Sequence, residues 1–118
     1  MQTLMKERLE DAGIDVSIAL ERFMGNETLL ERFLKKFLND ASYEKLVAAI
    51  GTGQREDALT ASHPLKGVSA NLAMTELSVL LNEQVAAFRA DDWDGAVKLM
   101  PEISKSYETI SAAIKAIE

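Results

Sequence analysis

Hydrophobic residues recur every three or four positions along most of the chain, which is the spacing of helices that bury one face. No segment shows the alternation of period two that is typical of a half-buried strand. Glycine, asparagine and aspartate residues interrupt the periodic segments. The pattern therefore predicts an all-α fold.

The interruptions divide the chain into two short and four long predicted helices. The short helices are predicted at residues 2–10 and about 16–24. The first long helix is predicted at residues 27–50, with a kink near 39–42, and two helices meeting at that point are the alternative. The remaining long helices are predicted at residues 54–72, from Thr75 to the Asp91-Asp92 break, and 93–116. The residues expected to cap helices are Asp15, Asn26, Thr75 and Asp92.

Four long amphipathic helices joined by short loops must run antiparallel. We therefore expect an up-down-up-down four-helix bundle, with the two short N-terminal helices packed on one end or side of it. The 118 residues are enough for one hydrophobic core, so residues 1–118 are predicted to be a single domain.

The segment 60–72 contains the only histidine of the chain, His63. On a helix, His63, Lys66, Gly67 and Ala70 share one face because residues three, four and seven apart lie above one another. The apolar residues of the segment lie on nearly the opposite face; these are Ala58, Ala61, Leu65, Val68 and Leu72. A lone histidine is more often a structural residue, but this geometry predicts that His63 points to solvent.

The sequence His63-Pro-Leu-Lys66-Gly67 resembles the His-x-x-Lys-Gly motif of histidine-containing phosphotransfer (HPt) domains. The likeness extends through residues 13–16, 20–23, 29–38 and 75–88, which together with the motif span most of the chain. It implies a carrier in a phosphorelay, in which His63 accepts a phosphoryl group from a receiver-domain aspartyl phosphate and passes it to another receiver aspartate. It also implies that the partners are receiver domains of response regulators or hybrid histidine kinases, which supply Mg²⁺ and the catalytic aspartates.

The residues of the motif suit this chemistry. A neutral imidazole is a good nucleophile towards phosphorus. Lys66, one turn away, would stabilise the charge of the phosphoryl group, although a solvated surface lysine is the simpler interpretation. A glycine inside a helix costs about 1 kcal/mol relative to alanine. Gly67 would leave room for the partner's loops to approach; the alternative is close packing between helices.

Four further residues are weaker candidates for the docking face. Leu59 and Ala70 flank the histidine and are expected to be exposed. Gln84 would hydrogen-bond the second imidazole nitrogen of His63, although a glutamine that reaches water at the edge of the bundle is the simpler interpretation. Arg89 is a candidate for phosphoryl contact or partner docking.

Pro64 departs from the HPt pattern. It removes the hydrogen bond to the Thr60 carbonyl and disfavours helical geometry at His63. We expect a bent but continuous helix that leaves His63 exposed; a helix that begins anew at Pro64 is the alternative. Pro101 predicts a bend in the last helix.

Composition excludes several other classes of function. Without cysteine and with a single histidine, a transition-metal site is not expected, and no cofactor is predicted. A net charge of −6 argues against nucleic-acid binding. No apolar run is long enough for a signal peptide or a membrane span, so we expect a cytoplasmic protein, and we expect a monomer.

The residues also bear on enzymatic activity. The chain has no phosphate-binding loop, so it should not phosphorylate itself with ATP and is predicted to be a carrier and not an enzyme. A hydrolase would need a base paired with a nucleophile at recognisable spacing, and none is found. The alternative function is a helical adaptor that binds receiver domains without being phosphorylated, because Pro64 misplaces the imidazole.

Overall fold

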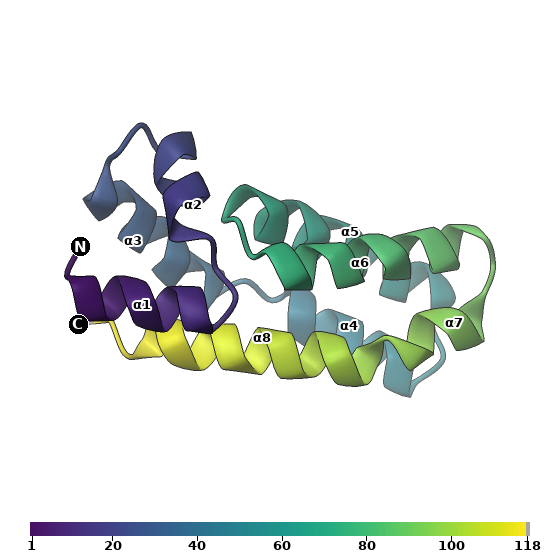
Figure 1. The fold of residues 1–118 in the computed structure, drawn as a ribbon. Coiled ribbons are helices and arrows are strands. Elements are labelled where there is room, and N and C mark those ends of the chain that lie inside the picture. The colour runs from purple at the N-terminus through teal and green to yellow at the C-terminus, as the bar shows by residue number, and fades with distance from the viewer. Residues whose placement is uncertain (118) are drawn as a thin grey trace.

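The structure is a computed structural model that describes residues 1–117 of the chain. Its helices are α1 (Thr3–Asp11), α2 (Val16–Arg22), α3 (Glu27–Phe37), α4 (Ser42–Gly51), α5 (Arg55–Asn71), α6 (Thr75–Arg89), α7 (Trp93–Lys98) and α8 (Met100–Lys115) (Figure 1). The described residues contain no strand, only one isolated antiparallel bridge between Ile14 and Met74. The predicted all-α class is confirmed.

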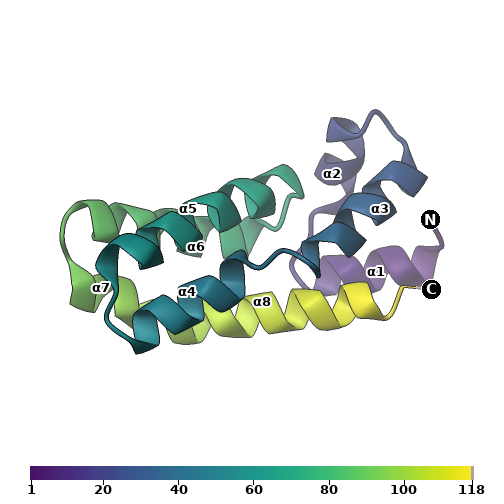
Figure 2. The ribbon, with the colours of Figure 1, turned by 180° about the vertical axis from the view of Figure 1, so that it is seen from behind.

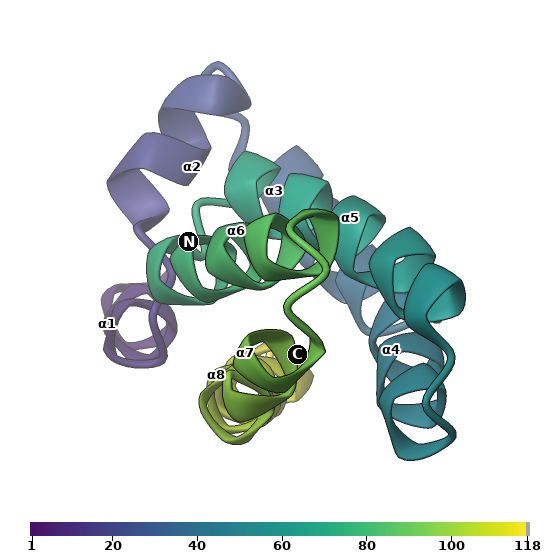
Figure 3. The same cartoon turned by 90° about the vertical axis from the view of Figure 1, so that its right-hand side faces the viewer.

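The helices form an elongated body of 43 × 22 × 20 Å. The central hairpin is made by α5 and α6, and α4 packs along the other side of α5 (Figure 2). Beneath them α8 runs along the long axis and contacts α6, α3 and α1 (Figures 1 and 3). The first three helices, the N-terminus and the C-terminal end of α8 lie at the same end of the body.

Three of the four predicted caps are confirmed. The side chain of Asp15 accepts a hydrogen bond from the Ile18 amide at 3.1 Å, and that of Asn26 accepts one from the Leu29 amide at 3.0 Å. Asp92 does the same for the Gly95 amide at 3.0 Å. The prediction for Thr75 is wrong. Because buried Met74 ends the tight turn after α5 and occupies the cap position, Thr75 is already the first residue of α6.

The single helix predicted at residues 27–50 is wrong, and the alternative of two helices is correct. Helix α3 ends at Phe37 and α4 begins at Ser42. Between them the carboxylate of Asp40 accepts a hydrogen bond from the Ser42 amide at 2.8 Å. Such a local bond satisfies an amide that a continuous helix would bond to a carbonyl, so it favours the break.

The single helix predicted at residues 93–116 is also wrong. It is divided at Leu99 into α7 and α8, where only a bend had been predicted. Pro101 lies in the first turn of α8, where a residue needs no amide hydrogen because the first amides of a helix lack carbonyl partners. Because α8 begins just before Pro101, the proline costs none of the backbone hydrogen bonds that it would remove inside a continuous helix.

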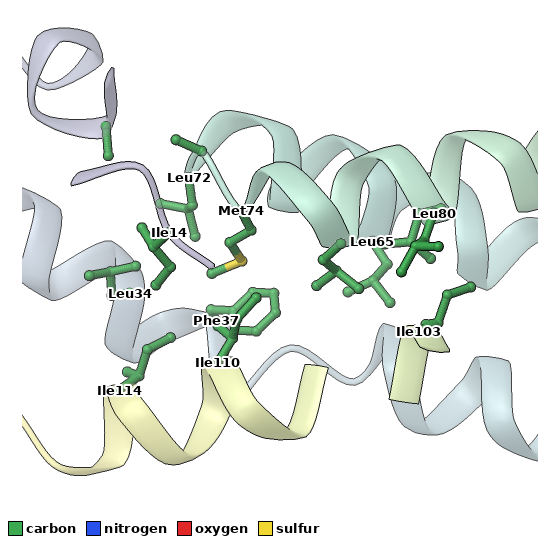
Figure 4. Packing of buried hydrophobic residues seen from close by; sticks show 14 of the residues in the cluster. Ile14, Leu34, Phe37, Leu65, Leu72, Met74, Leu80, Ile103, Ile110 and Ile114 are labelled. Carbon is green, nitrogen blue, oxygen red and sulfur yellow. The ribbon is translucent and has the colours of Figure 1, made fainter. Parts of the chain in front are cut away.

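The core runs the length of the body between the α5–α6 hairpin and α8. Phe37, Met74 and Ile110 meet near its middle, and Leu65, Leu80 and Ile103 continue it towards α7 (Figure 4). Each fully buried side chain of this size contributes about 1.5–3 kcal/mol of hydrophobic stabilisation. Leu65 is fully buried, so it fixes the rotation of α5 about its own axis. No helix of the described residues is long and apolar enough to span a membrane.

Candidate functional site

The candidate site lies on the outward face of α5. The helix continues from Arg55 to Asn71 through Pro64, as predicted, and His63 is exposed. Pro64 deprives the Thr60 carbonyl of its helical donor. Thr60 is itself exposed, so water can bond that carbonyl and the helix tolerates the proline.

The inward face of α5 is the predicted apolar stripe. Ala58, Ala61, Leu65 and Leu72 are buried, and Val68 is half-buried. Since residues 63 and 65 lie about 200° apart on a helix, burial of Leu65 holds His63 on the solvent side. The side chain of His63 has no hydrogen-bond partner among the residues described.

Gly67 lies one turn beyond His63 and is exposed. A methyl group built at its α-carbon would meet no atom of a neighbouring helix within 4 Å. Close packing between helices, the alternative reason for a glycine at this position, is therefore excluded. The open space lies beside the imidazole on the same face.

Lys66 and Ala70 complete the outward face. Lys66 is half-buried and pairs with no carboxylate within residues 1–117. Ala70 is exposed, as predicted, and its carbonyl accepts a hydrogen bond from the guanidinium of Arg22 in α2. The structure thus brings a second cation, which sequence reasoning missed, to the C-terminal end of this face.

The predicted contact between Gln84 and His63 is wrong, and so is the simpler interpretation that Gln84 reaches water. Gln84 is fully buried between helices. Its Oε1 accepts a hydrogen bond from Ser62 Oγ at 2.8 Å, and its Nε2 donates to the Ala96 carbonyl at 3.1 Å. Ser62 lies on the side of α5 that faces α6. The side-chain amide of Gln84 therefore bonds Ser62 and not His63, the next residue in the sequence.

The other two predicted docking residues differ in where they lie relative to the histidine. Leu59 lies one turn before His63 on α5, whereas Arg89 lies on α6. Leu59 was expected to be exposed but is half-buried, because it lines a pocket of about 280 Å³ that Phe88 and Trp93 close from α6 and α7. Arg89 is exposed at the end of α6. The Ser62–Gln84 bond sets the register of the hairpin, and Arg89 lies five residues beyond it, about 7.5 Å along the axis towards α7.

A groove between α2, α3 and the C-terminal half of α5 was missed by sequence reasoning; we call it the α2–α3–α5 groove. It encloses about 490 Å³, and its apolar walls are Phe23, Phe33, Phe37, Val68 and Leu72. Its polar lining comes from Arg22, Lys36, Asp40 and Asn71. The sequence feature that could have indicated this groove is the apolar stripe on residues 29–38, which is too wide for all of its residues to face one core.

Other polar groups do not form a second site among the described residues. No group of three or more His, Asp and Glu side chains within residues 1–117 could hold a metal ion. Burial raises the pKa of Tyr107, and the charges of Asp40 and Glu44 act in the same direction. Its ring stacks on Tyr43 with centroids 3.8 Å apart. Tyr107 therefore belongs to the packing of α4 on α8 and not to the outward face of α5.

Comparison of the chain with protein-family models, with curated proteins and with solved structures finds no match. The chemistry of the site thus has to be argued from its residues. They are an exposed imidazole, a cation one turn away and an open space beside both.

Proposed function

We propose that this chain is a phosphocarrier of a His-Asp phosphorelay. His63 accepts a phosphoryl group from an aspartyl phosphate of one receiver domain and passes it to the aspartate of another. The single observation that carries the proposal is the exposed imidazole beside a helical glycine that no packing explains. The resemblance of the His63–Leu72 stretch to the HPt motif supports the same function.

The phosphoryl transfer requires few chemical groups of the carrier itself. A lone pair of the neutral imidazole attacks phosphorus, the bond from phosphorus to the aspartyl oxygen breaks, and the carboxylate leaves. The doubly charged acyl phosphate and the neutral ring thus become a carboxylate and a phosphoimidazolium of net charge −1. Catalysis of such a step is mainly positioning and charge stabilisation.

Each residue of the outward face has one role in this proposal. The ammonium of Lys66 stabilises the phosphoryl oxygens as they approach. Gly67 leaves space for the receiver loops that surround the aspartyl phosphate. Helices α4, α5, α6 and the α7–α8 pair are proposed to be the antiparallel four-helix bundle that holds this face rigid, with α1, α2 and α3 packed at one end.

The direct test is phosphotransfer from receiver domains. Each receiver domain encoded in the source genome is phosphorylated on its aspartate, mixed with the carrier and removed. We expect at least one receiver to label the carrier with phosphate that is labile in acid and stable in base, as expected for phosphohistidine. His63→Gln should abolish the label without changing the thermal midpoint.

A matched pair of lysine variants tests the role assigned to Lys66. Lys66→Ala should slow labelling at least tenfold, because a charge that stabilises the transferred group is lost. Lys98→Ala, which removes an exposed lysine of α7, should leave the rate unchanged. A carrier that binds receivers but is never labelled would instead be the helical adaptor.

A further inference from the structure

The α2–α3–α5 groove pairs an aromatic wall with cations that the chain itself does not neutralise. Phe33 is 39% exposed, although it sits between two helices. The ammonium of Lys36 lies 5.1 Å from the centre of its ring. Neither Lys36 nor Arg22 forms an ion pair within residues 1–117. This concentration of positive charge is a local exception in a chain of net charge −6.

Both cations are held in place by contacts that leave them charged and accessible. The ring of Phe33 holds the ammonium of Lys36 through a cation–π contact. One nitrogen of the Arg22 guanidinium donates a hydrogen bond to the Ala70 carbonyl, and the remaining N–H groups can donate to another acceptor. The one carboxylate of the groove, Asp40, accepts the bond from the Ser42 amide that starts α4. The groove is therefore built to receive an apolar group with a negative charge next to it.

The groove also lies within the footprint of any protein that reaches His63. Val68 and Asn71 line it, and they follow the histidine on the same helix by about 7.5 and 12 Å along the axis. A partner that buries about 800 Å² covers a patch of roughly 16 Å radius. A receiver centred on His63 would thus cover the groove in the same encounter.

The opposite end of α5 carries the opposite charge. Glu56 and Asp57 lie in its first turn and are exposed. A negative segment is attracted at the groove and repelled at this end, so the two ends distinguish two orientations of a partner over the histidine. Such charge arrangements set encounter and register more than they add affinity.

We propose that the α2–α3–α5 groove receives an acidic segment of the receiver partner, in which an aromatic or branched aliphatic side chain lies next to a carboxylate. The apolar side chain packs on Phe33 and Val68, and the carboxylate meets Lys36 and Arg22. This contact orients the receiver over His63. The proposal rests on the phosphocarrier function for the identity of the partner.

The test compares two lysines of α3. Lys36→Glu reverses a charge that lines the groove, whereas Lys35→Glu makes the same change one residue away, on an exposed side chain outside it. With a receiver that phosphorylates His63, we expect Lys36→Glu to raise KM for transfer at least fivefold with kcat nearly unchanged. The KM of this variant should also depend less on salt concentration than that of the wild type. Lys35→Glu should change KM less than twofold. Phe33→Ala should also raise KM, because it removes the apolar wall of the groove and the ring that holds Lys36.

A small-molecule probe tests the groove independently of phosphotransfer. The carrier is titrated with 4-phenylbutanoate and with its uncharged amide while backbone NMR signals are followed. We expect the carboxylate to shift signals of Phe23, Phe33 and Val68 and to bind at least threefold tighter than the amide, a preference that Lys36→Glu removes. Equal affinities, or shifts elsewhere, overturn the groove proposal, and so does a KM for Lys36→Glu equal to that for Lys35→Glu. Absence of histidine labelling by every receiver overturns the carrier function alone.

Discussion

The two faces of α5 differ in how many contacts their side chains make with the rest of the chain. On the inward face, Leu65 is buried in the core, and the hydroxyl of Ser62 is bonded to Gln84 of the neighbouring helix. On the outward face, the His63 ring has no hydrogen-bond partner among the described residues and Gly67 borders open space. Contacts within the folded chain account for the first set of residues but not for the second.

This comparison predicts opposite consequences for substitutions on the two faces. Changes to the inward face should lower the free energy of unfolding. Changes to the outward face should leave that free energy unchanged, or even raise it, while they reduce phosphotransfer. Variants of α5 and of its partner Gln84 test this separation and are given in order of decreasing effect on the free energy of unfolding. A variant of Tyr107, in α8, comes last.

Leu65→Ala should have the largest effect, a loss of about 2–5 kcal/mol in the free energy of unfolding, because it leaves a cavity where a fully buried side chain lay. Urea unfolding followed by circular dichroism measures it. Leu59→Ala is the matched control on the same helix and should lose less, since Leu59 is only half-buried. Equal losses would mean that α5 is not rotated as described.

Gln84→Met should lower the free energy of unfolding by about 1–3 kcal/mol, because it leaves the Ser62 hydroxyl buried without its partner. Adding Ser62→Ala should recover part of this loss, since both polar groups are then absent. A double-mutant cycle from unfolding curves gives the coupling. Additive losses would show that the two side chains do not interact.

Gly67→Ala should raise the free energy of unfolding by up to about 1 kcal/mol, because alanine is the better helix former and the added methyl meets nothing. The same variant should slow phosphotransfer from a receiver. Gly51→Ala, at the end of α4, also adds a methyl into open space and is the control for transfer. If both variants transfer at the wild-type rate, Gly67 has no role in partner approach.

Tyr107 should produce the smallest effect, and only in alkali. Its pKa is raised by burial, so the folded state binds the phenol proton more tightly than the unfolded state does. The associated stability is fully present below the unfolded pKa of about 10 and is lost as pH rises through the folded pKa. Thermal midpoints between about pH 9 and 11 should therefore fall more steeply for wild type than for Tyr107→Phe. Parallel curves would contradict the shift.

Local spacing along the chain was sufficient for the all-α class, for three of the predicted caps and for the outward direction of His63, but not for the breaks within two of the four long helices. The reason is that each depends on neighbours within two turns. An apolar residue at position 65 and a histidine at position 63 cannot both face the core. A side chain such as Asp15 reaches an amide three residues away whatever the rest of the molecule does.

Other features depended on contacts between distant segments, so only the tertiary structure decided them. The breaks at residues 38–41 and at Leu99 are the exception, because a local bond from Asp40 and the position of Pro101 favour them, yet the period of the apolar residues does not show them. Contacts between distant segments do decide two other features. Gln84 bonds Ser62 of α5, and the exposed Phe33 forms one wall of a groove whose other walls come from α2 and α5. Such pairings follow from which helices pack together and in what register, information that the period of a single helix does not contain.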